Sequence, residues 1–448
     1  MQDRKFKECN RDQLYLLPPS LRDWLPANHL AYFVVEVVSS FDLSAIYNSF
    51  KSQFGPPAFQ PEYMVAIWLY AYCAGVRSSR RVVKALQEDV GFRVVSGNQQ
   101  PDFRTLNEFR RKHHHILSGL FFETVKLAKE AGLVKLGHVA IDGTKVRANA
   151  SKHSAMSYQR MKEEEKRLEA EIEQWMREAD ETDAQEDKLH GDKSGWELPE
   201  HFATAERRLE NIRNAKTRLE ERAKQEAEAA KKDDDDHRNG SKTKAKVIEP
   251  QPKEQSNFTD PESQIMLNSD KAWVQAYNAQ AAVDAQTQII VAAELTNRPT
   301  DGPHLPELVK QTVKNTGETP REVSADAAYC SQANLELLDS YMIEPFIPPE
   351  KIKHSQWRDS KPILGRPPDS LSAREKMKRK LRTRRGKERY KLRQQSIEPV
   401  FGQIKEARGL RQFLHRRLEK TRSMWLFDCA AHNILKLFRA KTKLMATT

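Results

Sequence analysis

Three acidic residues stand where a carboxylate has a chemical use. Asp142 ends the apolar run VKLGHVAID, and Asp326 ends the shorter run VSAD. Both runs predict strands, and α/β folds expose functional groups at strand ends. Glu398 stands between apolar residues and a proline in YKLRQQSIEPVFGQIK, after a tract in which nearly every second residue is Lys or Arg. If the three carboxylates converge, they offer the oxygen ligands that Mg²⁺ takes in proteins.

Carboxylates that hold two Mg²⁺ or Mn²⁺ ions are suited to phosphoryl chemistry. Two such ions about 3.5–4 Å apart clamp the attacking and leaving oxygens of an in-line displacement. The rest of such a site needs cations for a nucleic-acid backbone. The chain has 75 Lys and Arg against 63 Asp and Glu, a net charge of +12, and a pI near 9.3. A surplus of that sign favours polyanions, nucleic acid first among them.

Each acid taken alone has a simpler interpretation. A single aspartate at the end of a strand more often forms a turn or caps a helix than binds a metal. Glu398 can pair with Arg393 or Lys405, and a glutamate in the first turn of a helix also complements the helix dipole. The combination of three acids with the basic tract at 373–393 favours the catalytic interpretation, in which the tract contacts phosphates.

The first segment, residues 1–132, predicts an all-helical domain. Gly75 ends the helix PEYMVAIWLYAYCAG. A helix, a turn and a second helix follow, with Ser78 or Ser79 as the first N-cap and Asp102 or Thr105 as the second. The cations of this pair predict contact with DNA, although a helical hairpin with a solvated face gives the same pattern. The DNA-contacting candidates are Arg80, Arg81, Arg104 and Arg110.

The second segment, residues 133–440, predicts a mixed α+β or α/β unit that carries the acids. Strands are expected in WVQAYNAQAAVD and QTQIIVAAELT, with a turn between them, and helices follow in PHLPELVKQTVKNTG and SQANLELLDSYM. Residues 156–255 interrupt this unit. They predict a charged helical hairpin over 156–230 and a looping or disordered segment after it. A structural coiled-coil protein would explain the hairpin but not the strand-end acids.

The remaining composition narrows the class of protein. The four cysteines have no short spacing, which excludes a CxxC metal or redox motif and makes a disulfide framework unexpected. The N-terminus does not resemble a signal peptide, and no apolar run reaches the length of a membrane span. We therefore expect a soluble intracellular protein. Trp273, Tyr277 and Trp425 are expected in the core.

Taken together, three motifs resemble the DDE transposases of bacterial insertion sequences: IDGTKVRANAS, SADAAY and YKLRQQSIEPVFGQIK. The last is similar to the branch whose third acid lies in a Tyr-x-x-Arg…Glu…Lys signature. NFTDPESQIM, AYNAQAAVD, LPPSLRDWLP, RSSRRV and TLNEFRRKH extend the resemblance over nearly the whole chain outside the charged hairpin. One difference is that four residues separate Arg393 from Glu398, where the usual form has three.

The resemblance implies a ribonuclease-H-like catalytic core and metal-dependent transposition of DNA. It makes Asp142, Asp326 and Glu398 the metal-binding acids, and it makes Tyr390, Arg393 and Lys405 the accessory residues that contact DNA. It further implies terminal inverted repeats and target DNA as partners, a homodimer on DNA, and a place in the bacterial cytoplasm at the nucleoid. A catalytically inactive or repurposed DNA-binding descendant is the alternative function.

Pro399 leaves the local geometry around Glu398 open, because proline disfavours helical geometry at the residue before it. On an unbroken helix, Tyr390, Glu398 and Lys405 share a face. Either a new helix begins at Ser396, or one helix kinks at Pro399. Both arrangements can direct Glu398 into a site.

Overall fold

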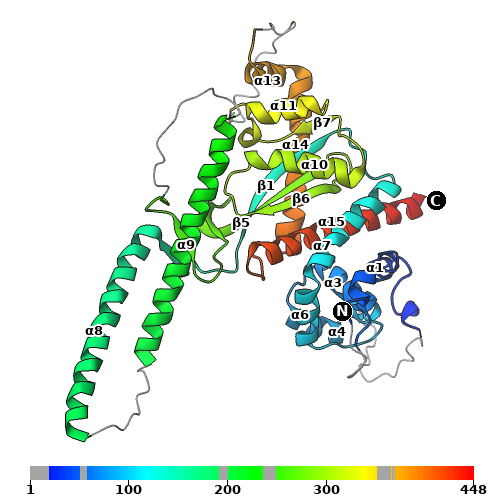
Figure 1. Cartoon of the computed structure of the whole chain (residues 1–448). Helices are drawn as coiled ribbons and strands as arrows, with labels where there is room; N and C mark the ends of the chain where they lie inside the picture. The colour runs from blue at the N-terminus through cyan, green and yellow to red at the C-terminus, as the bar shows by residue number, and fades with distance from the viewer. Residues whose placement is uncertain are drawn as a thin grey trace, which may run out of the picture.

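A computed structural model describes residues 20–50, 58–190, 200–235, 249–350 and 370–447, together with Gly365 and Pro368. The first part of the chain is helical (Figure 1). Its elements are η1 (Leu21–Asp23), α1 (Leu30–Ser39), α2 (Ser44–Tyr47), α3 (Pro61–Cys73), α4 (Ser79–Glu88), α5 (Val90–Val95), α6 (Phe103–Lys112) and α7 (His114–Glu130).

The helix boundaries in this part follow local sequence signals. Gly75 has a left-handed φ of 74° just after α3, as expected for a residue that ends a helix. Ser78 precedes α4 but makes no capping bond through its side chain. Asp102 caps α6, and its carboxylate accepts hydrogen bonds from the backbone N–H groups of Arg104 and Thr105. The predicted Asp102 cap is therefore confirmed.

One mixed sheet forms the centre of the molecule. In order across the sheet, its strands are β4 (Gln264–Leu267), β5 (Trp273–Asp284), β1 (Val139–Arg147), β7 (Glu322–Ser324) and β8 (Glu344–Phe346), and β6 (Ile290–Thr296) also pairs with β5. The pairs β1–β5, β4–β5 and β5–β6 are antiparallel, whereas β1–β7 and β7–β8 are parallel. The predicted strand 273–284 is confirmed in full.

Strand β1 begins later and runs further than the sequence predicted. It starts at Val139, and it continues through Asp142 to Arg147, so Asp142 does not end the strand. The reason lies in the residues before Val139. The backbone N–H groups of Lys135 and Leu136 donate to the buried carboxylate of Asp284, and Leu136 adopts a φ of 50°, so neither can join the sheet ladder.

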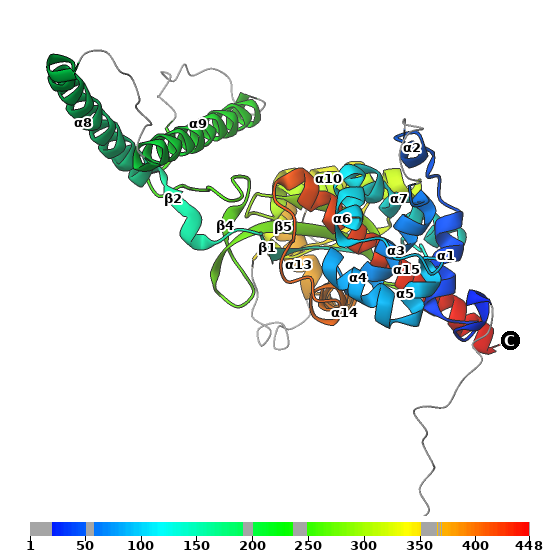
Figure 2. The same ribbon diagram turned by 90° about the horizontal axis from the view of Figure 1, so that it is seen from below.

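Helices cover both faces of the sheet. Helix α10 (Leu305–Thr316) and helix α14 (Arg384–Gly402) lie on opposite sides in Figure 2. Helix α14 packs on β1, and α15 (Leu418–Thr447) runs along β6 and α7. The remaining short elements near the sheet are η3 (Gly302–His304), η4 (Ala327–Tyr329), α11 (Gln332–Ser340), α13 (Ala373–Arg382) and the π-helical turn η5 (Gln403–Ala407).

The charged segment forms two long helices that project away from the sheet (Figures 1 and 2). Helices α8 (Tyr158–His190) and α9 (Glu200–Asp235) are framed at their base by η2 (Lys152–Ser154) and by the paired strands β2 (Ala155–Ser157) and β3 (Gln255–Asn257). They share a small apolar core that includes Leu168, Leu209 and Ile212. The predicted looping segment at 236–248 lies outside the described residues, whereas 231–235 are helical.

The helical part and the sheet share one continuous hydrophobic core. A buried ion pair fixes their contact: Arg77, just before α4, donates from Nε to both carboxylate oxygens of Asp428 on α15, at 3.0 and 3.1 Å. Gly75 lies against the same region, where an added Cβ would stand 2.9 Å from the Arg408 carbonyl oxygen. The junction therefore depends on close backbone approach and on a desolvated charge pair.

Two expectations from composition can be checked in the described residues. Cys73, Cys330 and Cys429 are buried and free of disulfides, and Cys9 lies outside the described part. Throughout the described ranges, no helix is both long enough and apolar enough to cross a membrane.

Replacing Asp428 with Asn should weaken the whole fold, because it leaves the buried Arg77 guanidinium without its counter-charge. We expect a loss of about 3 kcal/mol in unfolding free energy, the size typical of a broken buried pair. Denaturant unfolding followed by circular dichroism measures it.

The exposed pair of Glu36 on α1 and Lys441 on α15 is a matched control, because it joins the same two parts across solvent. Glu36→Gln should change stability by less than about 1 kcal/mol. Equal losses in the two variants would show that the Arg77–Asp428 pair contributes no more than a surface contact.

Candidate active site

The pairing of β1 with β7 brings two of the predicted acids together. Val139 is paired with Val323, and Ala140 with Ser324, in parallel register. Asp142 and Asp326 each lie two residues beyond the second pair. Since side chains alternate with a period of two along a strand, both acids stand at the same level and on the same face.

The two carboxyl groups are held by local hydrogen bonds. Asp142 accepts from its neighbour's backbone at Gly143, with N–Oδ1 at 2.9 Å. Asp326 caps η4 and accepts from the backbone N–H of Ala328, also at 2.9 Å. Asp326 thus makes the capping contact that its sequence position allowed, and it faces Asp142 as well.

Helix α14 places a cation directly on Asp142. Arg393 Nη2 lies 2.7 Å from Asp142 Oδ2, and both side chains are largely buried. Burial nevertheless raises the pKa of Asp142 to about 7, and the charges of Asp326 and Asp301 add to the rise, whereas Arg393 lowers it. Arg393 and Asp142 are within ion-pair distance, but the effect of burial and of the acidic neighbours on the pKa of Asp142 is larger than the opposite effect of Arg393.

The charges of all three predicted acids act on Tyr390 and Arg393. Burial is the main cause that raises the pKa of the Tyr390 hydroxyl, and the charges of Asp326, Asp142 and Glu398 raise it further. The same three carboxylates act on Arg393. The charges of all three acids therefore reach this Tyr–Arg pair on α14, and among them Asp142 contacts Arg393 directly.

Glu398 lies on an unbroken helix. Helix α14 runs from Arg384 to Gly402 with Pro399 inside it, so no new helix begins at Ser396. Proline has no N–H to donate to the carbonyl of Gln395, four residues earlier. The side chain of Gln288, in the β5–β6 turn, donates to that carbonyl instead, at 3.3 Å. This contact lets the helix continue through Pro399.

The spacing between Arg393 and Glu398 determines where the glutamate points. A residue four positions along a helix lies about 40° around it, and a residue five positions along lies about 140° around it. Ile397 has the first relation to Arg393 and is fully buried, whereas Glu398 has the second and is exposed. Among the described residues, no group of three or more His, Cys, Asp or Glu side chains is placed to hold a metal ion.

Lys405 reaches the site through the π-helical turn η5. Its Nζ donates to Thr144 Oγ1 at 3.1 Å, and Thr144 stands on the same face of β1 as Asp142. Burial lowers the pKa of Lys405. Single π-helical turns are frequent at functional sites, and this one turns the lysine toward the strand that bears Asp142.

Comparisons with known protein families identify two transposase domains in the chain. Residues 248–434 match the family described as Transposase DDE domain, and residues 19–112 match the Transposase domain (DUF772). The two matches together cover more than half of the chain. The chain belongs to the DDE transposases of insertion sequences. The DDE match includes Asp326 and Glu398, while Asp142 lies before it. No curated protein and no solved structure matches the chain.

The predicted DNA-contacting arginines of the transposase's helical part fall into two groups. Arg80, Arg81 and Arg104 are exposed. Arg110 is not: it is 6% exposed, donates to the Arg77 carbonyl at 2.7 Å, and stacks on Trp68 at 4.1 Å. The prediction that Arg110 contacts DNA was wrong, because its position on α6 faces the core. Sequence gave no sign of this, since a buried and an exposed arginine look alike in a basic helix.

Part of the basic tract pairs with acidic residues of the protein itself. Arg385 and Arg389 pair with Glu322, and Lys380 pairs with Glu344. Glu322 in turn contacts His138, which bonds to Ser324 on the strand leading to Asp326. Much of the charge at 373–393 therefore anchors α13 and α14 to the parallel edge of the sheet.

The sequence patterns did not predict Asp301 or the three side chains that bind it near Asp142. Asp301 accepts hydrogen bonds from Lys145, Asn278 and Gln280. In the sequence, Asp301 stood in a loop before a proline-containing helix, with no pattern to separate it from a turn former.

The aromatic expectations were only partly met. Tyr277 and Trp425 are fully buried, as predicted, but Trp273 is 62% exposed. Trp273 is the first residue of β5 and pairs with Leu267 at the end of the sheet, where nothing in the described residues covers it. Alternation in the sequence predicts a strand, but it does not show which end of the strand extends beyond the elements that pack on the sheet.

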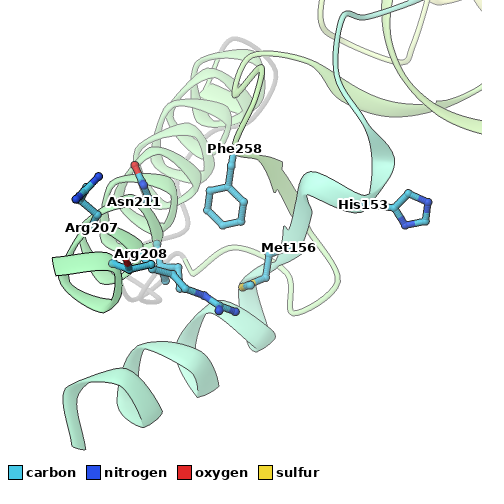
Figure 3. Close-up of a pocket in the computed structure, with 8 residues that line it drawn as sticks. His153, Met156, Arg207, Arg208, Asn211 and Phe258 are labelled. Atoms are coloured by element: carbon cyan, nitrogen blue, oxygen red, sulfur yellow. The ribbon is translucent and has the colours of Figure 1, made fainter. Parts of the chain in front are cut away.

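A hollow lies at the base of the inserted helices (Figure 3). It has a volume of about 460 Å³, and its apolar lining includes Met156, Ile212 and Phe258. Phe258 and Met156 lie within it, and His153 and Arg207 lie on opposite sides. It shares no residue with the acidic site.

Replacing Arg393 with Gln should raise the pKa of Asp142 above about 7, because Arg393 is the neighbouring charge that lowers it. The metal-free protein can be followed by ¹³C NMR of the aspartate carboxyl groups, with the Asp142 signal assigned from Asp142→Asn. Lys405→Gln is the control, and it should leave the titration near 7. A lower pKa in Arg393→Gln would contradict this electrostatic description.

Proposed function

We propose that this transposase cuts DNA at the ends of an insertion sequence and joins the freed ends to target DNA. The observation that carries the proposal is the parallel register of β1 and β7, which sets Asp142 and Asp326 side by side. Helix α14, which bears Glu398, packs on β1. Transposase family membership supports the same activity.

The core of this proposal is ribonuclease-H-like. Three antiparallel strands, β6, β5 and β1, followed by parallel β7 and β8, support that assignment. In it, residues 1–132 form the DNA-binding domain and 133–440 form the catalytic domain, with 156–255 inserted. The signature around Tyr390, Arg393, Glu398 and Lys405 assigns the Tyr-x-x-Arg…Glu…Lys branch.

The acidic residues suit divalent cations. Asp142 is largely buried, and its pKa is raised to about 7, so a hard cation would favour its ionised form. We assign Asp142 and Asp326 as the residues that would hold two Mg²⁺ or Mn²⁺ ions, with Glu398 joining them when DNA binds. The ions would supply activation of the attacking oxygen and stabilisation of the leaving oxygen.

The chain's own side chains hold and orient the DNA. Lys405 and Arg393 lie beside the acids and supply positive charge for phosphates on either side of the scissile bond. Burial raises the pKa of the Tyr390 hydroxyl. The proposed route is direct attack on the phosphodiester, without a covalent protein–DNA intermediate.

Two element ends must be brought together for transposition. We propose a homodimer on the terminal inverted repeats, with target DNA as the further partner and the bacterial nucleoid as its place of action. The exposed cations Arg80, Arg81 and Arg104 are assigned to the terminal repeats. A repurposed DNA-binding protein is the competing function, and the exposed position of Glu398 is the observation that favours it.

Glu398→Gln, Asp142→Asn and Asp326→Asn should each lower cleavage at least about a hundredfold, since metal ligation supplies several kcal/mol of transition-state stabilisation. Cleavage of supercoiled plasmid carrying the gene's own flanking DNA measures this in Mg²⁺ or Mn²⁺. Chelation by EDTA should abolish the cuts.

DNA binding is the control for these variants, and all three should retain it. Specific binding without any cut by the wild type would favour the repurposed protein. Cleavage by Glu398→Gln at the wild-type rate would show that Glu398 is not the third acid.

Arg104→Ala should weaken binding to the terminal DNA and lower the slope of log affinity against log salt by about 1, as expected for one lost phosphate contact. Fluorescence anisotropy at several salt concentrations measures the slope. Arg110→Lys is the matched control on the same helix. It should destabilise the fold, but the folded protein should keep the wild-type slope of log affinity against log salt. An unchanged slope in Arg104→Ala would remove Arg104 from the interface.

A further inference from the structure

Asp301 occupies a turn between β6 and α10 that reaches the strand bearing Asp142. Its Oδ1 accepts from Lys145 Nζ on β1 at 2.8 Å, and from Asn278 Nδ2 and Gln280 Nε2 on β5 at 2.6 and 2.8 Å. One carboxylate oxygen thus joins the two central strands at the level of the acidic site. The Lys145–Asp301 contact is charge-assisted, because it joins an ammonium to a carboxylate, and both side chains are mostly buried.

Gly143, the residue after Asp142, has no side chain to obstruct this contact. A Cβ added at Gly143 would stand 2.7 Å from Asp301 Oδ1 and 2.2 Å from Gln280 Nε2. Any larger residue at this position would force the side chains of Asp301 and Gln280 to shift away from β1. Asp142 projects from the opposite face of the strand, so the turn supports the strand directly behind the acid.

The same turn also touches the element that begins at Asp326. Gly302 lies against η4, where an added Cβ would stand 2.6 Å from the Ala328 carbonyl oxygen. Asn334 Nδ2 donates to the Gly302 carbonyl at 2.9 Å and to the Tyr329 carbonyl at 2.8 Å. The Tyr329 hydroxyl donates to Gln280, which is already bonded to Asp301.

These contacts form a closed loop behind the two aspartates. One side runs from Asp301 through Gly143 and Lys145 to Asp142. The other runs from Asp301 through Gln280 and Tyr329 to η4 and Asp326. The pairing of β1 with β7 ends at Ala140 and Ser324, but β1 stays paired with β5 past Asp142, so the sheet ladder holds Asp142 and does not hold Asp326. The loop supplies the constraint that the ladder lacks.

We propose that Asp301 is a positioning residue that sets the separation of Asp142 and Asp326 for metal binding. This inference rests on the proposed function, in which those two aspartates hold divalent cations. Asp301 acts through Gly143, Gln280 and Tyr329 and is assigned no contact with the metal ions. Two like charges held side by side repel each other, so the pair needs a scaffold that withstands the repulsion.

The test is Mn²⁺ binding to the full-length protein on its element-end DNA, followed by electron paramagnetic resonance of free Mn²⁺. The relevant binding is the part that Asp142→Asn removes. Asp301→Asn should weaken it about 10–100-fold, the range typical of residues that support metal ligands. Tyr329→Phe should act in the same direction more weakly, and affinity for DNA should not change.

Asp260→Asn is the matched control. Asp260 is also a buried aspartate bonded to a tyrosine, since Tyr277 donates to both of its oxygens at 2.9 and 3.0 Å. It touches neither β1 at Asp142 nor η4, so it should lower the unfolding midpoint without changing Mn²⁺ affinity. Unfolding midpoints of both variants separate positioning from general destabilisation.

The outcomes are distinct. Wild-type Mn²⁺ affinity in Asp301→Asn, or an equal loss in Asp260→Asn, would overturn the positioning role. Absence of any Asp142-dependent Mn²⁺ binding in the wild type would overturn it as well. Wild-type protein that binds Mn²⁺ at Asp142 but never cuts DNA would defeat the proposed function alone, and the Asp301→Asn comparison would still decide the positioning role.

Discussion

The parallel pairing of β1 with β7 is the constraint on which the rest of this molecule depends. Only two residue pairs make this contact, yet it brings together acids that stand 184 positions apart in the sequence. The pairing requires both strands to be buried from either side, and helices on both faces provide that cover. A shift by one residue would turn one acid to the opposite face of the sheet.

Carboxylates that lie close together repel each other, and cationic side chains on both faces of the sheet reduce this repulsion. On one face of the sheet, Arg393 pairs with Asp142, and Arg385 and Arg389 pair with Glu322. On the other face, Lys145 pairs with Asp301. The basic tract therefore has an internal role in addition to any contact with DNA. Burial is the main cause that still raises the pKa of Asp142, and the charges of Asp326 and Asp301 add to it.

Local signals predicted a large part of the fold. The alternating pattern of WVQAYNAQAAVD predicted the full extent of β5, and Asp102 caps its helix as expected. The strand around Asp142 was misplaced, because a side chain far away in sequence, Asp284, takes the backbone donors of Lys135 and Leu136. Arg110 and Trp273 were misassigned for a related reason: burial depends on which elements pack nearby, and a local pattern does not contain that information.

The sequence by itself determined which functional groups are present: three acids in strand and helix contexts, a surplus of cationic residues, and motifs typical of DDE transposases. Only the tertiary structure decided how these residues meet. It placed Asp142 level with Asp326 through strand register, turned Glu398 outward through helical phase, and set Asp301 behind the pair through a glycine contact. The physical reason is that residue type is a local property, whereas distance and burial arise from contacts between segments far apart in the chain.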